Sequence, residues 1–127
     1  MDLEVVIVSH RDGRWLAACL ASLERAAGLC AYRVTIVENG GSLIPLTECP
    51  TRRLIYSENR GFGAANNVGV RDSTADVLLF LNPDTELVEG TLERLARVMR
   101  ERPQVGLLYT NRVVHWRGVG HVRHLPA

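Results

Sequence analysis

A glycine-rich segment at residues 59–69 is the part of the chain best suited to bind an anion. It reads Asn-Arg-Gly-Phe-Gly-Ala-Ala-Asn-Asn-Val-Gly and opens a predicted helix. A glycine turn before a helix exposes backbone N–H groups, and the positive end of the helix dipole adds to their attraction for negative charge. This arrangement suits a diphosphate. Because G-x-G spacings are common and a glycine can simply relieve a tight turn, the segment alone is weak evidence.

A second polar segment, Asn82-Pro83-Asp84-Thr85, follows an apolar stretch at residues 77–81. A carboxylate oxygen is a suitable ligand for Mg²⁺ or Mn²⁺, and open α/β sheets bind ligands at the carboxyl ends of their strands. We therefore take Asp84 as the candidate metal ligand and expect the cation to bridge a nucleotide diphosphate held at the glycine turn. Asp after Pro is also frequent in turns and helix caps, so a structural role for Asp84 stays open.

Polar side chains follow the other predicted strands as well. A carboxylate at a strand end, such as Glu38, can accept hydrogen bonds from a base N–H or from ribose hydroxyls. Its alternative role is that of a solvated turn acid or a cap. A parallel sheet would bring these segments to one edge, and the candidate donor-binding residues there are Ser9, Glu38, Asn39, Asn59, Arg60, Gly61, Gly63, Asn82 and Asp84.

Strands alternate with helices along the chain. Apolar residues at three- and four-residue spacing predict one helix through Leu16, Cys19, Leu20 and Leu23 and another through residues 92–102. A third helix is expected from the glycine turn to about Asp72. The predicted strands are residues 5–8, 32–37, 54–56, 77–81 and 105–109. This order predicts the α/β class: a doubly wound, mostly parallel, Rossmann-like sheet with helices on both faces.

Composition limits the class of protein. The 127 residues are 46% hydrophobic, enough for the core of one domain, which we place at residues 1–110. Fifteen basic residues, all arginine, against fourteen acidic ones give no footprint of a nucleic-acid binder. No stretch reaches the roughly 20 apolar residues of a membrane span. Three cysteines without C-x-x-C spacing indicate reduced thiols and a cytoplasmic location.

Residues 111–127 form a basic tail with three histidines and no acid. The tail cannot supply a carboxylate base for an attacking hydroxyl. A histidine at position 115, 121 or 124 could serve as base or metal ligand, but histidines in a polar tail are more often solvated. Trp116 could stack on a sugar or anchor the tail, and we assign it neither role.

The motifs together resemble those of the family-2 glycosyltransferases. Residues 59–69 match the N-x-G-F-x-x-x-N-x-G segment of that family, residues 37–42 resemble its V-D-N-x-S turn, and residues 79–85 match L-L-N-P-D-T. The N-P-D-T form is most similar to the rhamnosyltransferase-like branch. Three positions differ from the usual pattern: Glu38 replaces Asp, Arg11 replaces Asn, and Asn82 replaces the first acid of D-x-D.

The resemblance implies a GT-A type fold and the transfer of a sugar, with inversion, from a nucleoside diphosphate donor to an acceptor hydroxyl. Glu38 would face the base, Asn66 and the glycine turn would lie near the donor, and Asp84 would reach the diphosphate through a divalent cation. The implied donor is a dTDP- or UDP-sugar, and the implied product is a bacterial cell-envelope glycan or polysaccharide. The protein could then act peripherally at the inner face of the membrane.

Family members usually continue for another hundred or more residues, which build the acceptor site. Two hypotheses therefore stay open: a transferase whose acceptor portion comes from a partner chain or a homodimer, and a non-catalytic nucleotide-sugar-binding module. Without an acceptor half, the sheet edge and the helix at residues 92–102 should expose apolar surface, which favours self-association. A dinucleotide dehydrogenase fits poorly, because Ser-His-Arg-Asp-Gly rather than G-x-G-x-x-G follows the first strand.

Overall fold

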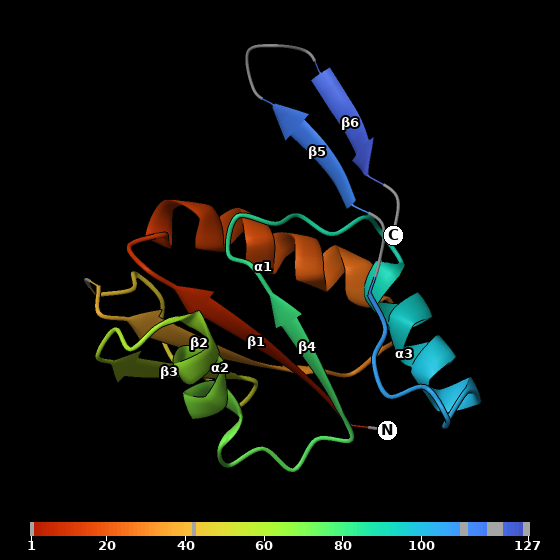
Figure 1. Ribbon diagram of the computed structural model, residues 1–127, viewed down its shortest axis with the longest axis horizontal. Coiled ribbons are helices and arrows are strands. Elements are labelled where there is room, and N and C mark those ends of the chain that lie inside the picture. Colours follow the sequence, from red (N-terminus) through yellow and green to blue (C-terminus); the bar gives the residue numbers. More distant parts are fainter. Residues whose placement is uncertain (1, 42, 110–111, 117–120, 126–127) are drawn as a thin grey trace.

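The computed structural model describes residues 2–41 and 43–109, together with the backbone of two strands at 112–116 and 121–125. The elements, in chain order, are β1 (Leu3–Ser9), α1 (Gly13–Ala27), β2 (Arg33–Asn39), β3 (Arg52–Ser57), α2 (Phe62–Val70), β4 (Val77–Leu81), α3 (Thr91–Glu101), β5 (Arg112–Trp116) and β6 (His121–Leu125) (Figure 1).

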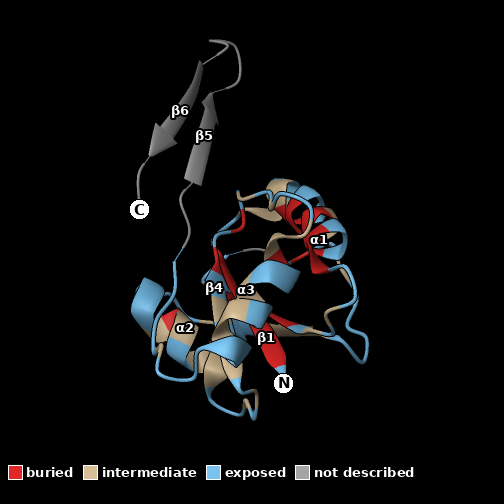
Figure 2. Cartoon of the chain, turned by 90° about the vertical axis from the view of Figure 1, so that its right-hand side faces the viewer, coloured by how far each residue is buried: buried red, intermediate tan, exposed pale blue. Residues whose placement is uncertain are grey.

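The main sheet has four parallel strands in the order β3-β2-β1-β4. Strand β1 is central, and all seven of its residues are buried. Such a strand needs apolar side chains on both faces, which explains the continuous run of β-branched residues at positions 5–8. Figure 2 shows the buried residues gathered in β1 and along the inner side of α1.

Helices cover both faces of this sheet. Helices α1 and α3 share one apolar cluster, in which Leu16, Leu23 and Leu92 pack with Val5 and Ile7 of β1. The opposite face carries α2, whose Ala65 packs with Val8 and Val37. The predicted α/β class, with a parallel sheet between two helical layers, is therefore confirmed.

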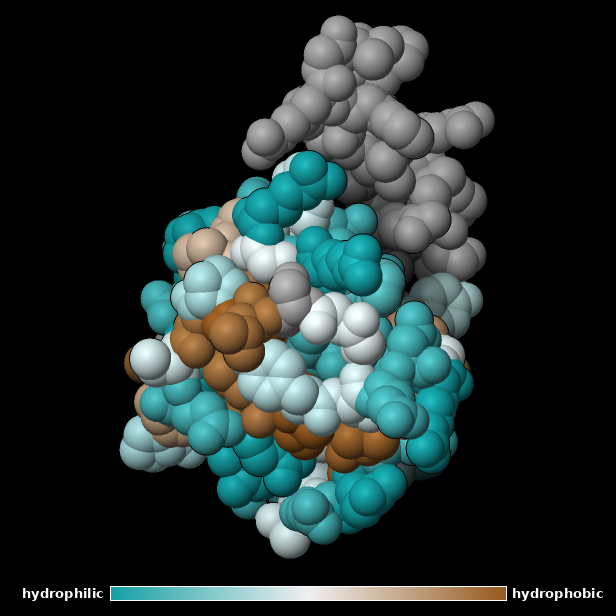
Figure 3. All heavy atoms as spheres, turned by 90° about the vertical axis from the view of Figure 1, so that its left-hand side faces the viewer, coloured by the Kyte–Doolittle hydropathy of each residue, from teal (hydrophilic) through white to brown (hydrophobic). Residues whose placement is uncertain are grey.

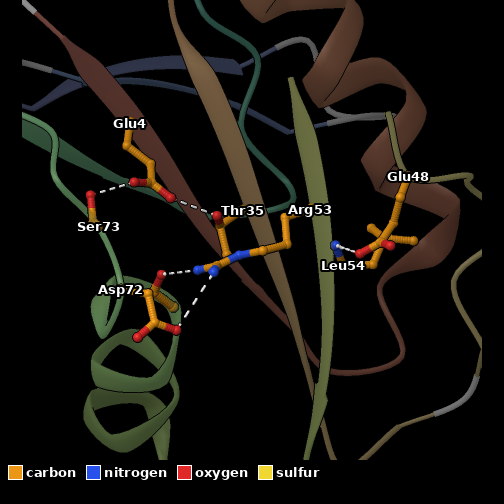
Figure 4. A network of polar contacts seen from close by, with 8 residues as sticks. Glu4, Thr35, Glu48, Arg53, Leu54, Asp72 and Ser73 are labelled. Carbon is orange, nitrogen blue, oxygen red and sulfur yellow. Dashed lines mark hydrogen bonds and ion pairs between the residues drawn. The ribbon is translucent and has the colours of Figure 1, made fainter. Parts of the chain in front are cut away.

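A polar network joins the amino ends of the strands beneath α2 (Figure 4). Glu4 is buried in β1, and its Oε1 accepts a hydrogen bond of 2.6 Å from the Thr35 hydroxyl of β2. The Ser73 hydroxyl, just after α2, donates to the other carboxylate oxygen. Arg53 of β3 donates through Nη2 to the carbonyl oxygen of Gly69, 3.0 Å away. The network thus ties three strands to the end of α2 and satisfies a carboxylate that burial would otherwise penalise.

The predicted strand at residues 105–109 is wrong. These residues follow α3 without forming a strand, and β4 is left at one edge of the described sheet. Leu107 is 83% exposed, so this apolar sequence lacks the burial that the prediction assumed. The next strands along the chain are β5 and β6, which pair with each other as an antiparallel hairpin. The boundary between residues 110 and 111 stays a prediction.

Smaller differences concern the ends of elements. Strand β2 was predicted to end at Val37 but continues through Glu38 and Asn39, which are buried residues of the strand rather than of a turn. Strand β3 is longer than the predicted residues 54–56, and α2 ends at Val70 rather than near Asp72. The N-cap of α3 is Gly90, so Asp84 does not cap that helix.

Candidate functional site

The candidate site lies at the carboxyl edge of the parallel sheet. From β1 the chain proceeds outward through β2 to β3, and β4 then returns to the other side of β1. This reversal makes the gap beyond the ends of β1 and β4 the topological switch point, where open α/β sheets bind their ligands. Ser9 ends β1, and Asn82 directly follows β4. Strands β2 and β3 point toward the left-hand side of Figure 1. Figure 3 shows that side of the molecule, where hydrophilic groups surround an apolar patch.

Glu38 is the buried carboxylate of this edge, with only 2% of its surface exposed. It lies opposite Ser9 in the register of β1 and β2. Its Oε1 accepts a hydrogen bond of 2.9 Å from the backbone N–H of Arg11. A Cβ atom at position 41 would overlap the same oxygen, so only glycine fits at Gly41. Glu38 therefore lies near the end of a strand, as predicted, but its side chain is buried rather than solvated.

The turn after β1 is held in a fixed conformation. His10 Nδ1 lies 2.7 Å from the carbonyl oxygen of Asn39, which can only accept, so Nδ1 carries the proton. The His10 backbone N–H donates to Asp12 Oδ2 over 3.0 Å. Between these two anchors, Arg11 adopts a φ of +59°. A left-handed conformation is unfavourable for a residue with a Cβ, so these contacts must hold it.

Asn39 and Asn59 connect β2 to the glycine turn. The Asn39 amide donates to Asn59 Oδ1 over 3.2 Å, and that oxygen also accepts from the Gly61 N–H at 3.1 Å. Gly61 has a φ of +97° and is the N-cap of α2, and no side chain caps this end. The helix therefore presents its first backbone N–H groups without a side-chain acceptor, as the predicted anion site requires.

Asp84 is exposed on the loop after β4, close to α1. Burial, and then the charges of Asp84 and Glu86, raise the pKa of the Cys19 thiol to about 11. The Cys19 Sγ also lies 3.8 Å from the Asn82 carbonyl oxygen. The thiol is therefore a poor nucleophile at neutral pH. Within the described residues, no three His, Cys, Asp or Glu side chains gather as a metal-binding group.

Three buried polar atoms of the predicted residues have no hydrogen-bond partner in the described part of the chain: Ser9 Oγ and Asn39 Oδ1 at the strand ends, and Asn66 Oδ1 in α2. Ser9 is fully buried, and Asn39 is only 5% exposed. A buried polar group without a partner costs free energy, and such groups are uncommon unless a ligand or water satisfies them. All three residues were predicted from the sequence.

Two other predicted residues, Arg60 and Gly63, are not among the residues with unpartnered buried atoms. Arg60 Nη2 pairs with Glu58 Oε2 at 3.2 Å, and both side chains are largely exposed. Gly63 lies exposed in the first turn of α2. The side chains of His115, Trp116, His121 and His124 lie outside the described part of the chain. A cavity of about 180 Å³ opens at the opposite, amino edge of the sheet, lined by residues that include Glu4, Arg33 and Asp72.

Sequence reasoning did not place His10, Arg11 and Gly41 in the roles that they have here. Arg11 follows the first predicted strand and differs from the family pattern, but nothing in its sequence context indicates a left-handed conformation. Gly41 could have been suspected, because a second glycine beside Gly40 exceeds what one turn needs. Its function depends on where the Glu38 carboxylate lies, which only the tertiary structure shows.

An open parallel sheet with a polar carboxyl edge and an uncapped glycine turn is an arrangement typical of ligand-binding α/β proteins. A family model described as glycosyl transferase family 2 matches residues 4–124, and the chain belongs to that family. The similarity to the rhamnosyltransferase-like branch stays a prediction.

Two curated bacterial relatives are similar in sequence. One is an uncharacterized glycosyltransferase, YwdF, of Bacillus subtilis (strain 168), 28% identical over 102 residues, or 76% of this chain and 38% of the relative. The other is an N-acetylglucosaminyltransferase of Sinorhizobium fredii (strain NBRC 101917 / NGR234), 30% identical over 111 residues, or 80% of this chain and 27% of the relative. The chain therefore spans well under half the length of either protein.

Solved structures support the GT-A type fold. The crystal structure of S. aureus TarS 1-349 has a TM-score of 0.71 at 18% identity and covers 95% of this chain and 39% of that one. The same fragment in complex with UDP-GlcNAc also has a TM-score of 0.71 at 18% identity, with 95% and 37% covered. In the described part of the chain, no helix has both the length and the apolar character needed to cross a bilayer.

Proposed function

We propose that this chain binds a nucleoside diphosphate sugar at the carboxyl edge of its sheet and transfers the sugar to an acceptor hydroxyl in glycan synthesis. The proposal rests on two observations at the carboxyl edge: the buried, unpartnered polar atoms Ser9 Oγ and Asn39 Oδ1, and the uncapped start of α2. Membership of glycosyl transferase family 2 supplies the class of ligand.

In this proposal the nucleoside lies over β1 and β2. Glu38 Oε1 is occupied by the Arg11 N–H, so Oε2 is the oxygen that accepts from a base N–H or a ribose hydroxyl. The Asn39 oxygen and the Ser9 hydroxyl gain partners from the same ligand. The diphosphate then reaches the N–H groups in the first turn of α2, after Gly61, where the helix dipole favours negative charge.

A divalent cation, Mg²⁺ or Mn²⁺, completes the proposed donor site at Asp84. Mg²⁺ commonly binds through only one or two protein carboxylates together with substrate phosphates, so a lone exposed carboxylate fits this use. The cation, when bound, neutralises charge that develops on the departing diphosphate. Asp84 would hold the cation, and Asn82 beside it would offer an uncharged oxygen.

A uridine diphosphate sugar is the donor that the relatives favour. One relative is named an N-acetylglucosaminyltransferase, and structures similar to this chain contain UDP and UDP-GlcNAc. We therefore propose UDP-GlcNAc as the first donor to test. The N-P-D-T motif makes a dTDP-sugar such as dTDP-rhamnose the second. The acceptor is a glycan at the cytoplasmic face of the membrane.

A donor-binding module without turnover is the second candidate. The polar groups described at the carboxyl edge all suit contacts with a donor, which fits this candidate equally well. Donor binding is common to both candidates, and only turnover separates them. Turnover requires a base for the acceptor hydroxyl, a role to which none of the described residues is assigned.

Titration calorimetry of the chain with UDP, UDP-GlcNAc and dTDP-rhamnose, each with and without Mn²⁺, tests the donor site. We expect saturable binding of at least one ligand. The double variant Ser9→Ala/Asn39→Ala should bind that ligand more weakly. Absence of binding to all three ligands in both conditions would refute the proposed function. Release of UDP from the bound donor in the presence of a glycan acceptor would then favour the transferase over the binding module.

A further inference from the structure

We propose that Arg11 binds the diphosphate of the donor and supplies a part of donor affinity that needs no metal ion. This inference rests on the proposed function, because it assigns a contact within the same donor site. Arg11 belongs to neither of the two parts of the proposed diphosphate site, the glycine turn and Asp84. The usual family pattern has Asn at its position.

The backbone of Arg11 is held where relaxed geometry would not place it. Arg11 is the only non-glycine residue with a positive φ in the described part of the chain. The buried Glu38 carboxylate holds its N–H, and Gly41 leaves the space that this contact needs. Strained backbone at the edge of a site is often a sign that the side chain must be presented in one direction.

Arg11 is exposed in the turn after β1, the strand that borders the switch point with β4. The described ion pairs join Arg53 to Asp72 and Arg60 to Glu58, and neither includes Arg11. Two residues away, the hydroxyl of Ser9 is completely buried and lacks a partner among the described residues. Arg11, whose guanidinium takes part in none of the described ion pairs, therefore follows by two positions a buried hydroxyl that also lacks a described partner.

The chemistry of arginine fits a diphosphate at this position. A guanidinium is always charged and presents a planar fork of N–H donors that matches phosphate oxygens in a bidentate manner. Asp84 is the one carboxylate in the Asn82–Asp84 pair, where the family usually has two acids, so a cation held there receives little help from the protein. Arg11 adds a fixed positive charge to the same site.

Binding of UDP and of uridine in the presence of EDTA tests this assignment, since uridine lacks the diphosphate. Arg11→Ala should weaken UDP binding about tenfold or more, the effect expected for a lost hydrogen bond to a charged group. Its affinity for uridine should be unchanged. Arg11→Lys should fall between Ala and wild type, because lysine keeps the charge but loses the fork. Arg25→Ala, which removes the same charge from the other end of α1, is the matched control and should bind both ligands as wild type does.

Arg11→Gly separates the side chain from the fold. Glycine adopts a positive φ without strain, so the thermal midpoint of this variant should equal or exceed that of Arg11→Ala, whereas its UDP affinity should be just as low. Unchanged UDP binding by Arg11→Ala would overturn the inference and leave the proposed function intact. An equal loss for UDP and uridine would also overturn it, by assigning Arg11 to the nucleoside. Absence of UDP binding by the wild type in EDTA would also overturn the inference, whereas the proposed function falls only if none of the three ligands binds with or without Mn²⁺.

Discussion

Replacing Gly41 with alanine is the sharpest test of the buried edge of the site. The added Cβ would overlap Glu38 Oε1 and lie 2.8 Å from Glu38 Cδ and 3.1 Å from the Arg11 backbone nitrogen. The carboxylate must therefore move, and its hydrogen bond with the Arg11 N–H is lost. A hydrogen bond to a charged group is worth about 1.5–3 kcal/mol, and overpacking costs about 1–3 kcal/mol. Movement of Glu38 breaks the hydrogen bond but relieves the overlap, so the two costs do not add in full. We therefore expect the free energy of unfolding to fall by about 2–3 kcal/mol.

Urea denaturation followed by circular dichroism measures this loss as a lower midpoint at an unchanged slope. Glu38→Ala removes the group that Gly41→Ala would strike, so adding Gly41→Ala to that variant should cost only about 0.5 kcal/mol. Gly106→Ala is the matched control, since its Cβ would meet nothing within 4 Å. An unchanged free energy of unfolding in Gly41→Ala would contradict this prediction. So would an equal loss with and without the Glu38 carboxylate.

Three further predictions concern other parts of the molecule. Burial raises the pKa of Glu4, but hydrogen bonds from Ser73 and Thr35 and nearby arginine charges outweigh it and hold the pKa below 4.5. Glu4 therefore stabilises the fold above that pH, and this part is lost as the pH falls through the lowered pKa, so the free energy of unfolding should drop more steeply in acid for wild type than for Glu4→Gln. Asp84→Ala should abolish the Mn²⁺-dependent part of UDP affinity and leave the thermal midpoint unchanged, and calorimetry that finds the same affinity with Mn²⁺ would exclude Asp84 from the site. Phe80 is 51% exposed on the edge strand β4, so sedimentation should show self-association that Phe80→Lys reduces, and a clean monomer at high concentration would contradict this.

Most of the fold could be predicted because its elements carry strong local patterns. The apolar run of β1 and the spacing of Leu16, Cys19 and Leu23 in α1 each indicate one type of element with one buried side. The prediction of a strand at residues 105–109 was wrong because an apolar run does not show whether a neighbouring strand will pair with it. β4 lies at the edge of the described sheet and is apolar, but it does not pair with this segment.

The candidate site divides in the same way. Glu38, Asn39, Asn59 and Gly61 were found because polar residues after apolar strands must emerge at the carboxyl edge of a parallel sheet. Their partners could not be read from the sequence. The hydrogen bond between Glu38 and Arg11 joins residues 27 positions apart, and that between Asn39 and Asn59 spans 20. Such contacts depend on strand order and register, not on local spacing.

The sequence by itself determined the α/β class, the family resemblance, and the chain segments that form the polar edge, because strand and helix periods and glycine turns are local properties of the chain. Only the tertiary structure decided that Glu38 is buried, that Arg11 is held in a left-handed conformation, and that Gly41 must lack a side chain. These features arise where strands β1 and β2 bring distant residues within hydrogen-bonding distance, and the free energy of each contact depends on what burial has removed from water.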